Sequence, residues 1–295
     1  MALRIAQLGR GRWGATLLDA WRDVPGAEVV AVADPRGGDG VVDEETLWRT
    51  GDVDALVIAS PPECHGLQAR RGLERGWHVF VEKPLTMGEG AGLLRLAEAQ
   101  GRLLMVGHLL LYCEAAMRVE AWLRAGRLGR LRRAAFRRWG RSGERRGVDA
   151  LWNLGPHDLA LADRWLGPLR VTRSRAWSTD GPLCDEAWVE LDGRVPIEIH
   201  VGHGLAPAPR GARRRAVLEG EEATAVLEGE RVSLHRGGAV VEAHVRRTDP
   251  LRAELADFVA CTGGGTPRAD AAGGVRVVRL LREAMAARRR QVRAG

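Results

Sequence analysis

Lysine, asparagine and tyrosine are almost absent from this sequence of 295 residues, where each occurs once, as Lys83, Asn153 and Tyr112. Lysine and arginine together number 45, so every one of these side chains except Lys83 is an arginine. This bias is typical of GC-rich coding, in which arginine replaces lysine wherever a positive charge is sufficient. We therefore infer that the single lysine and the single asparagine persist where arginine or aspartate would not perform the same chemistry.

Cysteine is also scarce, and its four positions contain no CxxC pair, so the sequence suggests neither a zinc ribbon nor a disulfide framework. No apolar run approaches the ~20 residues that span a bilayer, because the nearest, Leu103–Cys113, contains Gly107 and His108. The first residues lack the pattern of a secretory signal. We therefore predict a cytoplasmic protein that does not cross a membrane.

The net charge of +7 suggests nucleic-acid binding, because arginines neutralise phosphate. Aromatic side chains for base stacking are not regularly interleaved with the arginines, however. We predict no nucleic-acid partner and keep arginine-driven binding as a third hypothesis. His200 and His203 form an HxxH pattern without an evident third ligand, so no metal site is predicted.

The first third of the sequence alternates short apolar strands with amphipathic helices. Such alternation predicts right-handed crossovers and a doubly wound parallel sheet. We assign residues 1–117 to this α/β domain. Its predicted strands are Leu3–Leu8, Val29–Ala33, Ala55–Ala59, His78–Val81 and Leu103–Gly107.

Beyond residue 117, a two-residue periodicity predicts a second, α+β domain over residues 118–295 with a large, mostly antiparallel open sheet. Turn signals at Gly229-Glu230 and Gly237-Gly238 divide residues 214–245 into hairpins, and Leu205–Arg215 is interpreted as a mobile loop. An open sheet needs cover for its apolar face, so we predict a homodimer or homotetramer. The predicted strands are Leu131–Trp139, Val171–Trp177, Ala187–Leu191 and Val195–His200, and the predicted helices are Leu159–Leu166, Leu251–Cys261 and Gly274–Arg293, the last with Arg288-Arg289-Arg290 at its end.

A GxGxxG motif lies between the first strand and an apolar-periodic helix, the context that gives this motif its meaning. Gly9 permits a tight turn, Gly11 lets a pyrophosphate approach the backbone, and Gly14 lets helix and strand pack closely. The predicted cofactor-binding residues of this loop are Gly9, Arg10, Gly11, Arg12, Trp13 and Gly14.

Asp34-Pro35 closes the second strand 20 residues after Gly14. A carboxylate at this position can accept hydrogen bonds from the adenosine ribose hydroxyls, which favours NAD. Arg36 can instead meet a 2′-phosphate, so NADP stays possible. An ordinary turn at Asp34-Pro35 is the alternative without a ligand.

Two further segments follow strands and so lie at the carboxyl edge of the predicted sheet, where ligands bind in open α/β folds. Ser60-Pro61-Pro62 with His65 follows the third strand, and Glu82-Lys83-Pro84 follows the fourth. His65 either contacts the cofactor or begins a helix without a chemical role. Lys83 can donate or accept a substrate proton if burial and neighbours lower its pKa. We include Ser60, Pro61, Pro62, His65, Glu82 and Lys83 among the cofactor-binding residues.

Asn153 and His157 are four residues apart in a segment that opens a helix of the second domain. They share a face if the first turn is already helical, with Pro156 tolerated because early helical N–H groups lack partners. His157 can then act with Lys83 as an acid or base, although a histidine at a helix start is more often a cap or packing residue.

Together these motifs resemble the Gfo/Idh/MocA family of oxidoreductases over nearly the whole chain, with Glu82-Lys83-Pro84 as the most specific. Trp13-Gly14, Gly107-His108-Leu109 and residues 151–158 look most like those of bacterial nucleotide-sugar 3-dehydrogenases. The resemblance implies a Rossmann domain and hydride transfer between a sugar carbinol carbon and nicotinamide. It implies a sugar or nucleotide-sugar substrate, with Lys83, His157 and Asn153 as catalytic residues.

One departure from the family pattern is Asn153, where aspartate is usual, because an amide can orient a hydroxyl but cannot take its proton. Either Lys83 and His157 suffice, which we favour, or the substrate differs, or the protein binds cofactor and ligand without fast turnover. The last reading motivates an alternative hypothesis, a non-catalytic sensor or partner-binding protein of the same fold.

Overall fold

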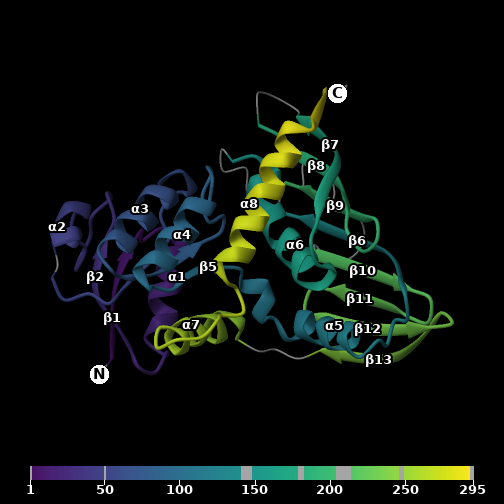
Figure 1. Ribbon diagram of the computed structural model, residues 1–295, viewed down its shortest axis with the longest axis horizontal. Helices are drawn as coiled ribbons and strands as arrows, with labels where there is room; N and C mark the ends of the chain where they lie inside the picture. Colours follow the sequence, from purple (N-terminus) through teal and green to yellow (C-terminus); the bar gives the residue numbers. More distant parts are fainter. Residues whose placement is uncertain are drawn as a thin grey trace. The chain divides into compact units, whose positions relative to one another are not determined.

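The computed structural model describes residues 2–49, 51–140, 148–178, 183–203, 214–245 and 249–292. The chain divides into two compact units, both discontinuous in sequence (Figure 1). Unit 1 contains residues Met1–Tyr112 and Asp249–Val278, and unit 2 contains Cys113–Thr248 and Arg279–Gly295. The domain boundary at 117/118 that we predicted from the sequence assumed two continuous halves. In the structure, each unit also includes a segment from the C-terminal part of the chain.

Unit 1 contains a five-stranded sheet in the order β2-β1-β3-β4-β5, and all of its strand pairs are parallel. This confirms the predicted doubly wound Rossmann sheet. Its strands are β1 (Leu3–Leu8), β2 (Ala27–Ala33), β3 (Ala55–Ile58), β4 (His78–Glu82) and β5 (Leu104–Gly107). Its helices are α1 (Arg12–Trp21), α2 (Glu44–Arg49), α3 (Pro62–Glu74), α4 (Ala91–Gln100), the short 3₁₀ helix η1 (Leu109–Tyr112) and α7 (Pro250–Cys261).

Helix α7 belongs to unit 1 although it follows the large sheet in sequence. Its Phe258 is fully buried, and its ring packs edge-on against Phe80 of β4 and Trp21 of α1. The Asp257 carboxylate accepts hydrogen bonds from the Tyr112 hydroxyl at 2.5 Å and the Arg268 amide at 2.8 Å. The buried Phe258 ring and the hydrogen bonds of Asp257 therefore hold this segment against unit 1.

Unit 2 contains a nine-stranded sheet in the order β13-β12-β11-β10-β6-β9-β8-β7-β14. The sheet is mostly antiparallel, as predicted, with parallel pairs only at β6/β9 and β7/β14 among the described residues. Its strands are β6 (Leu131–Trp139), β7 (Arg170–Ser178), β8 (Glu186–Asp192), β9 (Ile197–Gly202), β10 (Arg214–Gly220), β11 (Thr224–Glu228), β12 (Arg231–Arg236), β13 (Ala239–Val245) and β14 (Arg288–Val292).

Helices α5 (Glu114–Arg124) and α6 (Ala150–Leu166) pack on this sheet, α6 against β6, β8 and β9. The predicted hairpins between residues 214 and 245 are confirmed, with Gly229, Gly237 and Gly238 at positive φ in their turns. None of the described helices is both long and apolar enough to cross a membrane.

Two predicted boundaries in unit 2 were wrong for identifiable reasons. Helix α6 begins at Ala150, not Leu159, because the Asp149 carboxylate caps it by accepting from the Leu151 amide. Pro156 therefore lies in the helix interior and not in its first turn. Strand β9 begins at Ile197, after Pro196, which has no N–H group to donate to a ladder.

The C-terminal prediction was wrong in kind. Helix α8 (Ala271–Ala286) ends before the three arginines, and residues 288–292 form β14, which pairs in parallel with β7. The helix also starts three residues before the predicted Gly274, where the Asp270 carboxylate accepts from the Gly273 amide. Most of the predicted loop Leu205–Arg215 lies outside the described residues, but Arg214 and Arg215 begin β10.

Candidate nucleotide and substrate site

The predicted cofactor motifs of unit 1 meet at one edge of its parallel sheet. Gly9 follows β1, Asp34 follows β2, Ser60 lies two residues after β3, and Lys83 follows β4. Since all of these strands run in the same direction, their carboxyl ends lie at the same edge, where open α/β sheets bind ligands.

The glycine-rich loop fits a dinucleotide phosphate. Gly9 has a φ of +95°, and a Cβ there would lie 2.5 Å from the Ala59 carbonyl oxygen. A Cβ on Gly14 would lie well under 3.0 Å from the Gly9 carbonyl oxygen, so this glycine is needed for packing. A Cβ on Gly11 would meet only the Arg36 guanidinium, at 3.5 Å. Gly11 thus leaves its Cβ position open beside the start of α1, where backbone N–H groups suit a phosphate.

Gln7 supports this loop from below, a role that sequence reasoning missed. Its side chain is fully buried in β1, and its amide nitrogen donates to the carbonyl oxygens of Gly9, at 2.9 Å, and Gly14, at 3.0 Å. The sequence signal was a polar residue among the apolar residues of Ile5–Leu8, the buried part of β1. Gln7 therefore connects the two ends of the glycine-rich turn.

Asp34 is buried and accepts hydrogen bonds from two backbone amides and one guanidinium group. Its carboxylate accepts from the Arg10 amide at 2.6 Å, from the Arg36 amide at 2.9 Å, and from two guanidinium nitrogens of Arg36, each at 2.9 Å. The Arg36 side chain holds the pKa of Asp34 well below its usual range. Asp34 is therefore ionised at neutral pH, and a guanidinium stands directly beside it.

The Glu82-Lys83-Pro84 segment is connected to the glycine-rich loop through Trp13. The Trp13 indole N–H donates to Glu82 Oε1 at 2.5 Å, and the Lys83 amide donates to Glu82 Oε2 at 3.2 Å. Burial raises the pKa of Glu82. The Lys83-Pro84 peptide bond is cis. Trp13 thus joins two motifs 69 residues apart that were predicted independently to bind the cofactor.

His65 is buried in α3 and bridges the third and fourth strand ends. Its Nδ1 lies 2.7 Å from the Pro84 carbonyl oxygen and its Nε2 lies 3.0 Å from the Ser60 carbonyl oxygen. Burial lowers its pKa, so the neutral ring donates to one of these oxygens, according to its tautomer. This geometry accounts for His65 as a support of both loops, while its contact with a cofactor stays a prediction.

His108 and Glu254 are buried polar residues near this edge that were not assigned as site residues. Glu82 pairs with Gly107 across β4 and β5, so Lys83 and His108 are the next residues along neighbouring strands. The His108 ring has no hydrogen-bond partner among the described residues, and burial, with Lys83, lowers its pKa to about 4. Burial, Glu82 and Asp257 raise the pKa of Glu254 well above its usual value. His108 is therefore neutral at neutral pH, and the surroundings of Glu254 favour its protonated form.

In unit 2, α6 carries Asn153 and His157. The backbone N–H of Asn153 donates to the Asp149 carbonyl oxygen at 2.9 Å, so the first turn is helical. The side chains of Asn153 and His157 therefore share a face of α6. Both are partly exposed, whereas the intervening Gly155 and Pro156 are buried. Asp158, also buried, accepts two hydrogen bonds from the Arg138 guanidinium, each at 2.7 Å.

The other residues considered from sequence have protein partners. His200 Nε2 lies 2.6 Å from Glu186 Oε1, and His203 Nε2 lies 3.2 Å from the Val148 carbonyl oxygen. Within the described ranges, no three metal-ligating side chains come together. Several arginines of unit 2 form ion pairs with carboxylates: Arg130 with Glu221, Arg133 with Glu219, Arg138 with Asp158, and Arg215 with Glu228. These pairs leave fewer guanidinium groups for nucleic-acid phosphates.

Comparison with known proteins agrees with these motifs. Residues 3–108 match the model of the Gfo/Idh/MocA oxidoreductase family, NAD-binding Rossmann fold. A dTDP-3,4-didehydro-2,6-dideoxy-alpha-D-glucose 3-reductase of Saccharopolyspora spinosa is 28% identical over 302 residues, which cover 90% of this chain and 89% of that enzyme. An inositol 2-dehydrogenase of Streptomyces avermitilis is 36% identical over 145 residues, but these cover only 43% of this chain and 42% of that enzyme.

Among solved structures, KijD10, a 3-ketoreductase from Actinomadura kijaniata in complex with TDP-benzene and NADP, has the same fold. It superposes with a TM-score of 0.88 at 22% identity, and each chain is covered completely. The fold of both units, and not only that of the nucleotide-binding unit, thus recurs in a known oxidoreductase. The GxGxxG loop, Asp34 and Glu82-Lys83-Pro84, which lie at one sheet edge, all fall within residues 3–108, the part of the chain that matches the NAD-binding Rossmann fold of the Gfo/Idh/MocA oxidoreductases.

Proposed function

We propose that this protein is an NAD(P)-dependent oxidoreductase that interconverts a carbinol and a keto carbon of a sugar or nucleotide sugar. The observation that supports it most is the meeting of the glycine-rich loop, Asp34 and Lys83 at one sheet edge, with Trp13 bonded to Glu82. When bound, the nicotinamide cofactor supplies the site that accepts or releases a hydride. The remaining tasks belong to the protein: holding the dinucleotide, orienting the sugar and moving one proton.

Each unit has its own part in this proposal. In unit 1, backbone N–H groups at the start of α1 hold the pyrophosphate, and Asp34 accepts from the ribose hydroxyls. The Lys83 ammonium exchanges a proton with the reacting hydroxyl or stabilises negative charge on its oxygen. In unit 2, His157 assists this proton and Asn153 orients the hydroxyl. Because the Asn153 amide cannot take a proton, Lys83 and His157 carry the acid and base roles.

The substrate class follows from the relatives. The dTDP-sugar 3-reductase aligns over nearly the whole chain, which favours a nucleotide sugar over a free polyol. The test measures NADH formation from NAD⁺ with dTDP-glucose, UDP-N-acetylglucosamine and myo-inositol. Turnover of either nucleotide sugar in preference to inositol is the expected result. A protein that binds NADH but turns over no sugar would be better described as the non-catalytic sensor.

Because Asp34 and Arg36 are neighbours, we predict that replacing either one changes the preference of the protein between NADH and NADPH. Replacing Asp34 with alanine removes the acceptor for the ribose hydroxyls and should weaken NADH binding by about 10- to 100-fold, the usual value of a hydrogen bond to a charged group. Replacing Arg36 with alanine should weaken NADPH more than NADH, because only NADPH has a 2′-phosphate. Calorimetric titration of each variant with both cofactors checks this.

The exposed Arg22 provides the control, since its guanidinium pairs with Asp19 on the surface of α1. Arg22→Ala should leave both affinities as in the parent protein. Equal losses of NADH and NADPH in Arg36→Ala would contradict the assignment of that side chain to the 2′ position.

We also propose that the protein is a homo-oligomer that associates through the face of the large sheet opposite α6. Residues alternate between the two faces of a strand, so the buried Ile199 and Val201 point towards α6 and His200 towards the other face. Around His200 lie three partly exposed tryptophans, with ring centroids at 4.9, 5.6 and 6.5 Å: Trp139, Trp188 and Trp177.

Such an aromatic cluster suits the centre of an interface between identical chains. Light scattering after size exclusion should give a dimer or tetramer mass, and Trp188→Glu should reduce it to that of the single chain. A single-chain mass for the unmodified protein would contradict the proposal.

The cytoplasmic location stays a prediction.

A further inference from the structure

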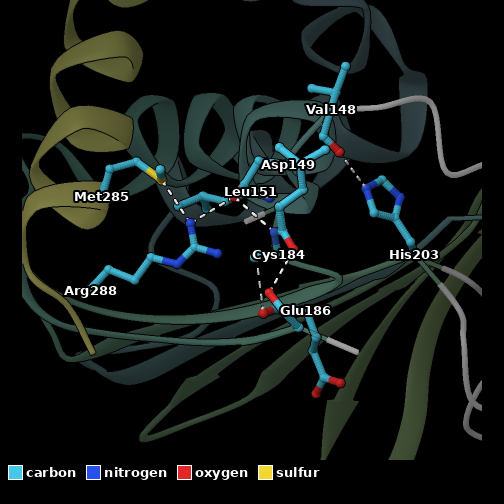
Figure 2. Close-up of polar contacts among 10 residues, drawn as sticks. Val148, Asp149, Leu151, Cys184, Glu186, His203, Met285 and Arg288 are labelled. Carbon is cyan, nitrogen blue, oxygen red and sulfur yellow. Dashed lines mark hydrogen bonds and ion pairs between the residues drawn. The ribbon is translucent and has the colours of Figure 1, made fainter. Parts of the chain in front are cut away.

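The most buried ion pair in the described part of unit 2 joins its C-terminal strand to the start of α6 (Figure 2). Arg288 Nη1 lies 2.7 Å from Asp149 Oδ2, with only 4% and 7% of the two side chains exposed. By contrast, Arg170 and Asp192 pair across β7 and β8 at the same distance but are 72% and 46% exposed. Burial makes the Arg288 pair far more sensitive to loss of one partner, because the remaining charge would stay desolvated.

Asp149 joins three segments through this one carboxylate (Figure 2). Its Oδ1 accepts from the Leu151 amide at 3.0 Å, which caps α6. Its Oδ2 accepts from the Cys184 amide at 3.2 Å, and the Cys184 carbonyl oxygen accepts from the Ala150 amide at 2.9 Å. The first turn of α6, the segment before β8 and Arg288 of β14 are therefore bonded to one another.

Arg288 is the member of this group that comes from farthest along the chain, 139 residues from Asp149. The same guanidinium nitrogen lies 3.4 Å from the sulfur of Met285 in the last turn of α8. Pairing of β14 with β7 holds Arg288 at this place. The ion pair therefore fixes the start of α6 to the edge of the large sheet.

Helix α6 carries Asn153 and His157 within the two turns that follow Asp149. We propose that Arg288 is a positioning residue: through Asp149 it holds the N-terminal turn of α6, and thereby the Asn153 and His157 side chains, in the place that substrate requires. This inference rests on the proposed function in giving those two residues contact with substrate. A displacement of about 1 Å in such residues can lower a rate about 100-fold, so a distant buried ion pair can matter for catalysis.

Cys184 provides a reporter of this connection that needs no substrate. It is buried, its thiol donates to the Glu186 carbonyl oxygen at 3.3 Å, and burial raises its pKa to about 12. The intact thiol is therefore protected from alkylation. In Arg288→Met, iodoacetamide labelling of Cys184 and hydrogen exchange of the Leu151 amide should each become at least about tenfold faster. The full-length protein is labelled, and mass spectrometry of its peptides then resolves both sites.

Arg288→Lys keeps the positive charge and should restore most of the protection, whereas Arg170→Met, which removes an exposed ion-paired arginine on β7, should change neither rate. If Arg288→Met does not fold, Asp149→Asn serves instead, because an amide oxygen still caps Leu151 while the ion pair is lost. Parental labelling and exchange rates in the variant that folds would overturn the proposal.

Turnover of the best nucleotide sugar from the panel separates positioning from simple stability. In Arg288→Met, kcat/KM should fall about 10- to 100-fold while the Kd for NADH stays unchanged, and Arg288→Lys should recover the activity. Parental kcat/KM in Arg288→Met overturns the positioning role. If His157→Ala also leaves turnover unchanged while Cys184 labelling accelerates in Arg288→Met, the proposed function has failed and the structural connection stands.

Discussion

Replacing Lys83 with methionine should lower kcat for the sugar substrate by about 100- to 10,000-fold, the usual contribution of a positioned acid or base. Lys83 follows directly after β4 at the ligand-binding edge, and its neighbour Glu82 is held by the Trp13 indole. Methionine keeps most of the length of the side chain but can neither carry a charge nor exchange a proton. Steady-state kinetics and calorimetric titration with NADH measure the two effects separately.

The affinity for NADH should survive this change, because the proposed function assigns the other end of the cofactor to the glycine-rich loop and Asp34. Arg70→Met, on the half-exposed surface of α3, provides a control for loss of a cation from unit 1. If kcat of Lys83→Met equals that of the parent, Lys83 is not the acid or base and the proposed chemistry is wrong.

Two glycines of one loop should respond in opposite ways to alanine. Gly14→Ala should destabilise unit 1 by about 1–3 kcal/mol, because its Cβ would collide with the Gly9 carbonyl oxygen. Gly11→Ala should leave stability unchanged, since its φ of −64° suits alanine and, among the described residues outside its chain neighbours, the nearest atom to the added Cβ is a guanidinium nitrogen of Arg36 at 3.5 Å. Gly11→Ala should nevertheless weaken NADH binding by about tenfold or more, because the methyl group would stand where a pyrophosphate approaches the backbone.

Urea denaturation and calorimetric titration of both variants provide the comparison. Alanine favours helices by about 1 kcal/mol over glycine, so a stabilised Gly14→Ala protein would show that the collision is relieved by a shift of α1. Unchanged NADH affinity in Gly11→Ala would mean that the cofactor does not approach this loop.

Much of unit 1 could be predicted because its signals are local. Five apolar runs separated by helical periodicity required parallel crossovers, and GRGRWG runs from the end of the first strand into the following helix, as its motif demands. The hairpins over residues 214–245 were equally predictable, since the glycines at two of their turns, Gly229 and Gly237-Gly238, meet the φ requirement of short connections.

Strand β14 could not be predicted, because its local sequence has the cations expected at a helix end. What makes it a strand is its pairing with β7 and the burial of Arg288 against Asp149, and both partners are more than 100 residues away in the chain. The same limit applies to Trp13 and Glu82, whose contact spans 69 residues. Helix α7 likewise carries no sequence sign that Phe258 packs against Phe80.

The sequence by itself determined which chemical groups are available to this protein: a glycine-rich turn after the first strand, a carboxylate at the end of the second, a single lysine in a Glu-Lys-Pro segment, and an asparagine and histidine one helical turn apart. Each depends on residues close together in the chain, so their spacing carries the information. Only the tertiary structure decided how these groups are supported, by Gln7 beneath the loop, His65 between two strand ends, and Arg288 at the start of α6. Such supports arise because buried polar groups must find partners, and the nearest partner in space can come from any part of the chain.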